Sequence, residues 1–265
     1  MTGPETALRD RPGAAGVTGP VRLSVVIPAR AEAELIGTVL ERLFAAVRTP
    51  CEVLVVVDSP DDTTVPPVRA HAAREPRLAC LVNRYGPGPA LAIRYGLDAA
   101  AGGVIVVMMA DGSDDPAQVD ELAALVEGGA AVAAASRYMA GGRQVGGRHV
   151  QRLLSGAAGR SLQLLARPGT SDATNSFKAY SAAFARSVGI ESRRGFQVGI
   201  ELTAKARRLR LPVAEVPTVW RGRAAGQSGF RLVRWLPGYV RWYLFCFGPQ
   251  LSLAELRQRS RGAGR

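Results

Sequence analysis

Residues 104–115 read Val104-Ile-Val-Val-Met-Met-Ala-Asp-Gly-Ser-Asp-Asp115, an apolar run that is followed directly by carboxylates. The run Val104–Met109 predicts a strand that is buried on both faces, because it lacks the polar alternation of a half-exposed strand. Two earlier segments share this design: Leu23–Ile27 ends at Pro28, and Val53–Val57 ends in the acidic turn Asp58–Asp62. Three such strands favour the core of a parallel sheet.

The segments between these strands have helical patterns. Helices are predicted over Ala33–Val47, Pro89–Ala100 and Pro116–Glu127, and further strands over Arg77–Val82 and Ala131–Ala135. Alternating strands and helices predict an α/β fold, in which helices flank a mostly parallel sheet. Ligands of such sheets bind beyond the carboxyl ends of the strands, so the polar residues that follow the strands are candidates for a site.

The composition excludes several classes of protein. The 265 residues are 47% apolar, as in a globular domain, and the three cysteines (Cys51, Cys80, Cys246) lie too far apart for a disulfide framework or a zinc ribbon. This cysteine usage fits a reducing cytoplasm. Residues 1–20 are rich in Gly, Pro and Ala and predict a flexible tail without the apolar centre of a signal peptide. No apolar stretch is long enough for a transmembrane helix.

The chain carries 34 basic and 22 acidic side chains, a formal net charge of +12. Such an excess fits nucleic acid, a membrane surface or phosphorylated substrates, or a solvated Arg-rich surface without a ligand. No acidic residue lies between Glu127 and Asp172, whereas six arginines do. Neither a base-reading helix nor an aromatic sheet is evident, so nucleic-acid binding is not predicted.

The carboxylates after Met109 have two interpretations. A cluster of this kind can hold a divalent cation that also contacts a diphosphate. Asp114 or Asp115 can instead cap the helix that begins at Pro116. The two roles are compatible, with Asp111 as the metal ligand and Asp115 as the cap. His71 and His149 have no partner at the spacing of a triad or a metal site, so hydrolase chemistry is not expected.

Several motifs together resemble one family. Leu23–Glu32, Val53–Thr64 and Met109–Pro116 resemble a GT-A (Rossmann-like) glycosyltransferase of family 2. The segments that follow have the order of the polyprenyl-phosphate hexosyltransferases, the dolichol-phosphate mannose synthase group: Ala135–Tyr138, Asp172–Tyr180, Gly195–Pro217 and Arg223–Ser228. The chain departs from the family pattern at Met109, which replaces the first Asp of Asp-x-Asp, and at Arg30, Ala31, Val57 and Gly229.

The resemblance implies a role for each matching residue. Asp111 would bind Mg²⁺ or Mn²⁺ with help from Ser113, and Arg137 would hold an acceptor phosphate. Arg223 would neutralise the donor diphosphate, and Asp172 joins Asp111, Arg137 and Arg223 as a catalytic candidate. The remaining candidates would contact donor or acceptor: Pro28, Ala29, Glu32, Asp58, Arg152, Ser155, Gln197, Glu201 and Ser228.

The resemblance further implies an inverting transfer of a hexose from a GDP- or UDP-linked sugar to a polyprenyl phosphate. A soluble family 2 enzyme that glycosylates a small hydroxyl acceptor in a specialised pathway is the alternative. The first reading predicts a peripheral protein at the cytoplasmic, inner face of the cell membrane, in contact with anionic lipid. It divides the chain into a tail (1–20), a GT-A catalytic domain (21–229), a membrane-interface segment (230–249) and a basic tail (250–265), and leaves the oligomeric state open.

The segment 230–249 adds a separate observation. Eight of the 16 aromatic residues lie between Trp220 and Phe247, interleaved with Arg231, Arg234 and Arg241. Aromatic rings beside arginines favour an amphipathic segment at a membrane–water interface, and Pro237-Gly238 predicts a break into two short helices. The alternative is an apolar helix that packs on the catalytic domain.

Overall fold

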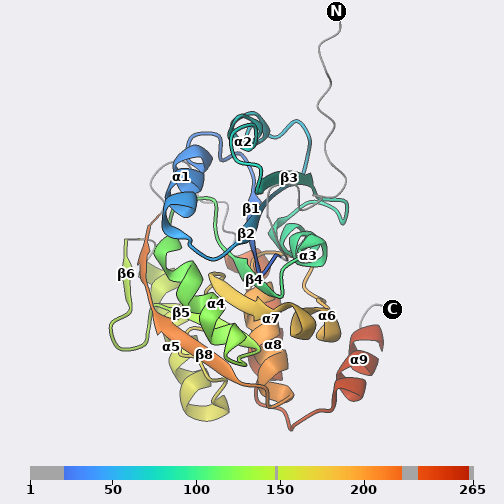
Figure 1. Ribbon diagram of the computed structural model, residues 1–265. Coiled ribbons are helices and arrows are strands. Elements are labelled where there is room, and N and C mark those ends of the chain that lie inside the picture. Colours follow the sequence, from blue (N-terminus) through green and yellow to red (C-terminus); the bar gives the residue numbers. More distant parts are fainter. Residues whose placement is uncertain (1–20, 147–148, 223–231, 263–265) are drawn as a thin grey trace, which may run out of the picture.

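The computed structural model describes residues 21–146, 149–222 and 232–262, apart from some side chains within helices. Its centre is a seven-stranded sheet with the strand order β3-β2-β1-β4-β7-β5-β8 (Figure 1). The strands are β1 (Leu23–Ala29), β2 (Cys51–Val57), β3 (Leu78–Val82), β4 (Val104–Val107), β5 (Val132–Ser136), β7 (Lys178–Ser181) and β8 (Val213–Pro217). Only β7 runs antiparallel to its neighbours in this sheet, β4 and β5, so the predicted mostly parallel sheet is confirmed.

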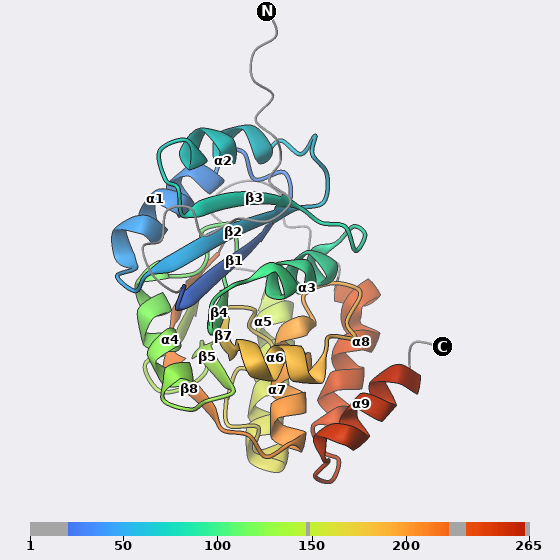
Figure 2. The ribbon, with the colours of Figure 1, turned by 45° about the vertical axis from the view of Figure 1, so that its right-hand side comes forward.

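Helices cover both faces of the sheet (Figure 2). One face packs against α1 (Ile36–Ala46), α2 (Val65–Ala72) and α4 (Val119–Glu127), and the other against α3 (Pro89–Ala99), α6 (Ala182–Val188) and α7 (Val198–Arg208). Successive residues of a strand point to opposite faces, so Val25 and Ile27 enter the first core and Val26 the second. Each central strand must therefore be apolar on both sides, as its sequence is.

Two of the elements that differ in their bounds from the sequence prediction lie beside the candidate site. Strand β4 ends at Val107 rather than Met109, because the Met109 N–H donates to the Asp114 carboxylate at 2.8 Å and leaves the ladder. The predicted helix after Pro116 begins as a 3₁₀ turn, Pro116–Gln118, which continues into α4. Asp115 caps this turn by accepting from the Ala117 N–H at 3.1 Å, as predicted for one of the two aspartates.

The remaining elements lie beside the carboxyl ends of the strands or at the C-terminus. A parallel two-stranded sheet joins β6 (Arg143–Val145) to β9 (Val219–Arg221). Helix α5 (His149–Ser161) continues into a single π-helical turn, η2 (Leu162–Ala166). Helices α8 (Leu232–Phe245) and α9 (Leu253–Gly262) complete the described chain and pack against α7 and α6, respectively.

The predicted break at Pro237-Gly238 is wrong, because α8 passes through both residues. Pro237 is the sixth residue of the helix, so the hydrogen bond it cannot donate would have ended on a carbonyl of the first turn. A tertiary contact holds this turn in place: the Gln197 side-chain amide donates to the Trp235 carbonyl at 2.9 Å. Gly238 makes room for that amide, since a Cβ there would collide with Gln197.

The tryptophans of this helix point inward. Trp235 and Trp242 are buried, and the Trp242 indole N–H donates to the Ser192 hydroxyl at 3.0 Å. For these two side chains the alternative interpretation of the sequence, packing on the catalytic domain, is the one observed. Among the described residues, no helix has both the length and the apolar character that a bilayer span requires.

Candidate active site

The loop after β1 is fixed by the loop after β2. Ala31 has a positive φ of 54°, and its N–H donates to both Asp62 carboxylate oxygens at 3.0 and 3.2 Å. The buried Glu32 donates its N–H to the Thr64 hydroxyl at 3.0 Å. Pro28 and Ala29 form the end of β1 directly before this loop. The predicted nucleotide-binding residues of β1 therefore lie on a loop whose backbone is held in one conformation.

Asp58 holds a second loop at the same edge of the sheet. Its carboxylate accepts from the Gly88 N–H at 2.8 Å and from the Asn83 side-chain amide at 3.2 Å. Asn83 also donates to the Gly86 carbonyl at 2.6 Å, so the two side chains together fix residues 83–88. Asn83 was not among the residues predicted from the sequence, although it directly follows the predicted third strand, where a polar residue is a candidate for the site.

Asp111 and Ser113 form a turn after β4. The Asp111 carboxylate accepts from the Ser113 N–H at 3.1 Å, and the Ser113 carbonyl accepts from the Arg221 N–H of β9 at 3.1 Å. The buried Ser113 hydroxyl oxygen has no hydrogen-bond partner in the described part of the chain. An unpartnered buried hydroxyl beside a carboxylate fits a cation ligand, because burial without a partner costs free energy.

The described residues do not supply a complete metal cage. Within residues 21–146, 149–222 and 232–262 no group of three His, Cys, Asp or Glu side chains is placed to hold a metal ion. Mg²⁺ commonly binds through one or two protein oxygens, with water and substrate phosphates completing its shell. Asp111 and Ser113 fit a cation of that kind, which a bound diphosphate would complete.

Asp114 is buried behind this turn and has an unusual carboxyl group. Burial raises its pKa to about 7, and the nearby Asp111 carboxylate adds to this rise. The Met109 N–H, Arg137 and Lys178 oppose it by favouring the charged form. Asp114 is thus able to exchange a proton near neutral pH, at a position between Asp111 and the arginine described next.

Arg137, at the end of β5, forms a two-point ion pair with Asp172. Its Nε lies 2.6 Å from Asp172 Oδ2 and its Nη2 lies 2.9 Å from Asp172 Oδ1, while its own N–H donates to Oδ2 at 3.1 Å. Burial alone would favour the neutral forms, but the mutual attraction outweighs it. The pKa of Arg137 is therefore raised and that of Asp172 is lowered. Both groups stay charged at neutral pH.

Three hydroxyl groups surround this ion pair. Ser155 of α5 lies 3.3 Å from Arg137 Nη2, 2.7 Å from the Tyr138 hydroxyl and 3.2 Å from the Thr174 hydroxyl. Thr174 also accepts from Arg137 Nη2 at 3.3 Å. The structure therefore brings Arg137, Asp172 and Ser155 together as candidates, and adds Tyr138 and Thr174, which the sequence analysis missed.

A buried lysine supports the loop that carries Asp172. The Lys178 ammonium donates to the carbonyls of Asp172 at 3.0 Å and Ala173 at 3.3 Å, and also to that of Asn175. Burial lowers its pKa to about 8, and the Asp172 carboxylate limits that fall. Lys178 belongs to β7, a strand that was not predicted from the sequence, and Lys178 was not among the predicted site residues.

Two other candidates have structural partners. Gln197 holds α8 through the Trp235 carbonyl, as described above. The buried Glu201 carboxylate accepts from the N–H groups of Glu191 and Ser192 at 2.6 and 2.8 Å and pairs with Lys205 at 2.7 Å. Their described contacts are with the α6–α7 and α8 segments rather than with the loops around Asp58 and Asp111.

Three predicted residues are not placed. Arg223 and Ser228 lie outside the described residues, and Arg152 belongs to α5 but its side chain is not described. The described residue that precedes Arg223 is Gly222, whose N–H donates to the Val145 carbonyl at 2.7 Å. The last described residues before Arg223 therefore lie next to β6 and to the Asp111–Ser113 turn.

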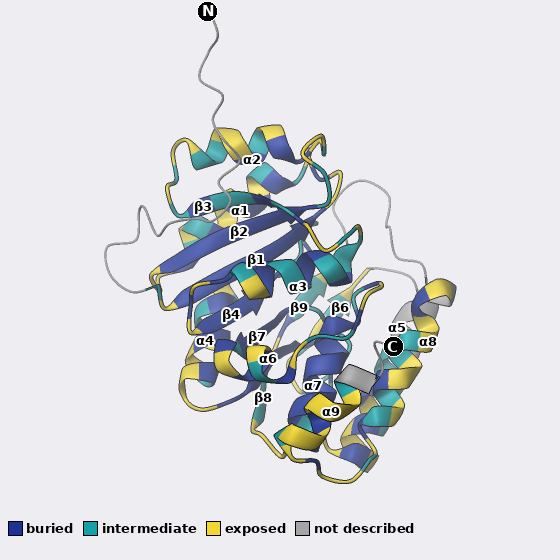
Figure 3. Ribbon diagram, turned by 90° about the vertical axis from the view of Figure 1, so that its right-hand side faces the viewer, coloured by how far each residue is buried: buried dark blue, intermediate teal, exposed yellow. Residues whose placement is uncertain are grey.

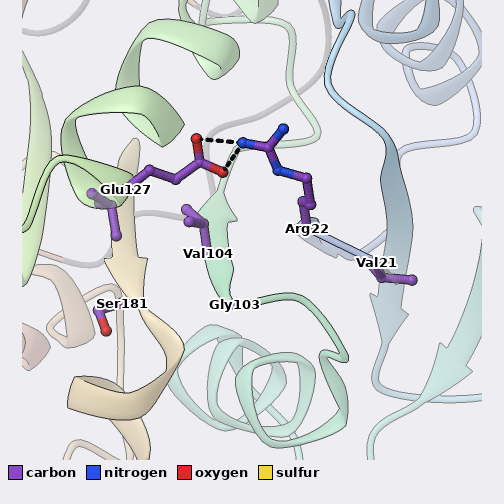
Figure 4. Close-up of a pocket in the computed structure, with 7 residues that line it drawn as sticks. Val21, Arg22, Gly103, Val104, Glu127 and Ser181 are labelled. Atoms are coloured by element: carbon purple, nitrogen blue, oxygen red, sulfur yellow. Dashed lines mark hydrogen bonds and ion pairs between the residues drawn. The ribbon is translucent and has the colours of Figure 1, made fainter. Parts of the chain in front are cut away.

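A cavity of about 370 Å³ lies at the opposite edge of the sheet. It is lined by residues at the amino ends of β1 and β4 and at the end of α4. Among the lining residues, Arg22 and Glu127 form an ion pair in which Arg22 Nη2 lies 2.8 Å from Glu127 Oε1 (Figure 4). Both partners are substantially exposed, so the pair contributes little stability. The cavity is separate from the polar loops at the carboxyl ends of the strands, where the candidate active site lies.

The sequence of this chain is similar to those of known proteins. The sequence model of glycosyl transferase family 2 matches residues 24–189, which include β1 to β7 and the loops described above. A curated relative, the undecaprenyl-phosphate mannosyltransferase of Micrococcus luteus, is 29% identical over 214 residues, covering 78% of this chain and 87% of the relative.

Solved structures share the fold. Glucosyl-3-phosphoglycerate synthase from Mycobacterium tuberculosis, solved with Mn²⁺, UDP and glucosyl-3-phosphoglycerate, matches with a TM-score of 0.61 and 21% identity over 95% of this chain and 88% of that one. The same protein solved with Mn²⁺ and UDP-glucose matches with a TM-score of 0.62 and 20% identity over 90% of this chain and 83% of that one. At these identities the likeness shows the fold alone, which is the predicted GT-A fold.

Proposed function

The chain belongs to glycosyl transferase family 2, and from this premise we propose that it transfers a hexose from a GDP- or UDP-linked sugar to a polyprenyl phosphate. The buried Arg137–Asp172 pair with its surrounding hydroxyl groups is the observation that carries this proposal. It offers a rigid set of donors for a phosphate in a stretch of chain that lacks acidic residues from 128 to 171. The similarity to an undecaprenyl-phosphate mannosyltransferase supports the same acceptor.

The donor would bind across the loops after β1, β2 and β4. Pro28, Ala29 and Glu32 would line the nucleotide pocket, and Asp58 would accept a hydrogen bond from the base. Asp58 already fixes the 83–88 loop through Gly88, so the nucleotide would meet a preformed surface. Arg223 and Ser228 would reach the diphosphate from the segment after β9.

A divalent cation, Mg²⁺ or Mn²⁺, would be held by Asp111 and Ser113 and would neutralise charge on the departing diphosphate. The unpartnered Ser113 hydroxyl supports this assignment. Solved structures that share the fold contain Mn²⁺ with UDP or UDP-glucose, which supports the same class of ion. The Asx turn at Asp111 fixes the carboxylate before any ligand binds.

The acceptor phosphate would be the nucleophile. A phosphate monoester has a second pKa near 6, so it is an anion at neutral pH and needs no general base. One of its oxygens would attack the anomeric carbon from the face opposite the donor diphosphate, while the bond between that carbon and the diphosphate oxygen breaks and leaves its electron pair on the diphosphate. Arg137 and the hydroxyls of Ser155 and Thr174 would orient the phosphate for this attack. Arg152 lies on the same helix as Ser155 and would add a further cation.

A small hydroxyl acceptor is the second candidate, and one observation favours it. An alcohol needs a base to remove its proton, and Asp114 has a pKa of about 7 beside Asp111 and Arg137. The solved structures that share the fold include one bound to glucosyl-3-phosphoglycerate, whose acceptor part is small and hydrophilic. An enzyme with this acceptor would work without a membrane.

A release assay separates the two acceptors. The purified protein is incubated with Mn²⁺ or Mg²⁺ and a panel of UDP and GDP sugars, and nucleoside diphosphate release is measured alone, with a short-chain polyprenyl phosphate and with 3-phosphoglycerate. We expect release that depends on the polyprenyl phosphate. Release that depends only on 3-phosphoglycerate would replace the first proposal by the second. On the first proposal the enzyme would act as a peripheral protein on the inner face of the cell membrane.

A further inference from the structure

Six aliphatic side chains are exposed on three elements near the Arg137 site: α5, η2 and α8. Their exposed fractions lie between 44% and 74%, which is high for large apolar residues. We call this set the leucine face: Leu153 of α5, Leu164 and Leu165 of η2, and Leu236, Val240 and Leu244 of α8. Figure 3 shows exposed positions along the outward side of α8.

The segment formed by α5 and η2 lies next to α8. The Ser161 hydroxyl at the end of α5 lies 2.9 Å from the Tyr243 hydroxyl of α8. Leu162 and Ala166 of η2 share a buried cluster with Trp242 of α8 and with Cys246, which directly follows that helix. Leu162 and Ala166 of η2 therefore pack near Trp242 of α8, whereas Leu164 and Leu165 of η2 and the three aliphatic residues of α8 named above are exposed.

Helix periodicity separates the two sides of α8. Leu236, Val240 and Leu244 are spaced by four residues and form one stripe along the helix. The buried residues Trp235 and Trp242 form another stripe, which faces α7. Trp235 and Trp242 thus face the interior, whereas Leu236, Val240 and Leu244 do not belong to the described buried clusters.

The positive charge around this face indicates what kind of partner binds it. In the sequence, the two stretches that include α5, η2 and α8, residues 128–171 and 216–254, contain eleven arginines and no Asp or Glu. Arg160, Arg167 and Arg234 are exposed on the same elements, whereas Arg241 pairs with Glu191 at 2.5 Å. Arginines beside exposed aliphatic residues match an anionic lipid surface. A second copy of this chain would instead bring arginine against arginine.

The same elements also form walls of the Arg137 site. Ser155 of α5 contacts Arg137 at 3.3 Å, and the largely buried Tyr239 of α8 lies within electrostatic reach of Arg137. A flat surface that covers the leucine face would therefore lie next to the buried ion pair. This is the position in which the phosphate of a membrane lipid could reach Arg137 while its chain stayed in the bilayer.

We propose that the leucine face is the membrane-docking surface of this protein and that it binds anionic bilayers through its aliphatic side chains and the flanking arginines. Docking itself does not depend on the reaction, but the delivery of a lipid phosphate to Arg137 rests on the proposed function. On this proposal the membrane is contacted by Leu236, Val240 and Leu244 and by the exposed leucines of α5 and η2, and not by the tryptophans that the sequence suggested.

Vesicle flotation of the intact protein tests docking. Wild type is mixed with vesicles of phosphatidylcholine and phosphatidylglycerol, and its partition coefficient is compared with that of L236S/V240S/L244S. Removing three partly exposed aliphatic side chains should lower the partition coefficient by more than about tenfold. The matched control Leu211→Ser changes an exposed leucine outside the face and should float as wild type does. Circular dichroism should show unchanged helix content in both variants.

Removing the arginine charges or the lipid charges provides an independent test of docking. R160Q/R167Q/R234Q should also weaken flotation, and wild type should lose affinity in pure phosphatidylcholine or at high salt. Unchanged flotation of L236S/V240S/L244S, or no flotation of wild type on anionic vesicles, overturns the proposal. A concentration-dependent dimer of wild type that the triple variant abolishes, without flotation of either protein, would assign the face to a second copy instead.

A third measurement keeps docking distinct from the reaction. Transfer to a short-chain polyprenyl phosphate in solution should be the same for wild type and L236S/V240S/L244S, while transfer to a long-chain acceptor in vesicles should fall in the variant. Flotation that needs the face, without transfer to either acceptor, supports docking and refutes the proposed acceptor. Equal transfer by both proteins from vesicles would refute delivery through this face.

Discussion

The proposed donor side of the site, formed by the loops after β1, β2 and β4, is built differently from the proposed acceptor side around Arg137 and Asp172. On the donor side, carboxylates hold backbone N–H groups of nearby loops: Asp58 holds Gly88, Asp62 holds Ala31 and Asp111 holds Ser113. On the acceptor side, side chains hold one another across long stretches of sequence, as Arg137 does with Asp172 and Ser155. The carboxylates of the donor side fix the conformation of loops, whereas the members of the acceptor side form a buried charged network in which the side chains hold one another.

This difference has an energetic consequence. A loop held by one carboxylate loses one or two hydrogen bonds when that group changes, about 1 kcal/mol each. A buried ion pair loses more when one partner is removed, about 3–5 kcal/mol, because the other charge is left without compensation. Donor-side variants should therefore affect ligand binding at nearly constant stability, and acceptor-side variants should affect both.

The largest expected effect is at Asp111. Asp111→Asn should lower kcat by roughly 10²–10³-fold, because the charge that holds the cation near the departing diphosphate is lost. The asparagine oxygen can still accept from the Ser113 N–H, so the melting temperature should stay within the error of the wild type. Chelation should inactivate the wild type to the same degree, and a variant that retains full metal-dependent activity would remove Asp111 from the metal site.

Arg137→Gln should come next, with about a hundredfold loss in kcat/KM for the acceptor. The variant should also lower the free energy of unfolding by about 3 kcal/mol, because Asp172 remains buried without its partner. R137Q/D172N should recover part of that stability but not the activity. Calorimetry should show nucleotide binding unchanged, and loss of nucleotide affinity would place Arg137 on the donor side.

Asp114 links the two sides and should produce a pH dependence. Its folded-state pKa of about 7 lies above its ordinary value, so the folded protein holds this proton more tightly than the unfolded chain does. The resulting stability is complete in acid and is lost as the pH rises through 7, by about 2 kcal/mol between pH 5 and pH 7. Urea unfolding of Asp114→Asn at these two pH values should lack that decline, whereas an unchanged slope would mean that another group titrates.

The smallest effect is expected at Asp58. Asp58→Asn should weaken donor binding by about tenfold, since a charged acceptor for the base and for the 83–88 loop becomes neutral. The KM for the acceptor should not change. Asp98→Asn is the matched control, because Asp98 is exposed on α3 and contacts only Tyr85 and Arg94 among the described residues. Equal effects of the two variants would show that Asp58 acts only through general charge.

Local sequence patterns predicted the strands beside the proposed donor side and the edge of the sheet at which it lies. β-Branched runs of five to six residues followed by Asp58 and Asp111 predicted both the strands and the edge of the sheet at which the polar loops gather. Apolar burial on both faces of a strand is written into consecutive residues, so it can be read without knowledge of the fold. The same holds for the cap at Asp115, because a cap and its helix are adjacent in sequence.

The acceptor side was predicted only as a set of separate residues. Arg137, Ser155 and Asp172 were candidates through resemblance, but their union with Tyr138, Thr174 and Lys178 depends on strands β5 and β7 lying side by side. Gln197 and Glu201 were grouped with the substrate-binding residues, and the described structure gives them partners in the packing of α7 against α8 and the preceding loop. Spacing along a chain does not reveal which distant side chains will meet.

Helix α8 shows the same division between what the sequence predicts and what tertiary packing decides. Composition alone indicated an aromatic and basic amphipathic segment, because the residue types and their period are properties of the sequence. Which side of that helix meets α7 was decided by tertiary packing: Gly238 admits Gln197, Trp242 reaches Ser192, and the leucines are left outside. Sequence determines what each face of a helix contains, and only the folded core decides which face it covers, because burial is settled by the shape of the neighbouring elements.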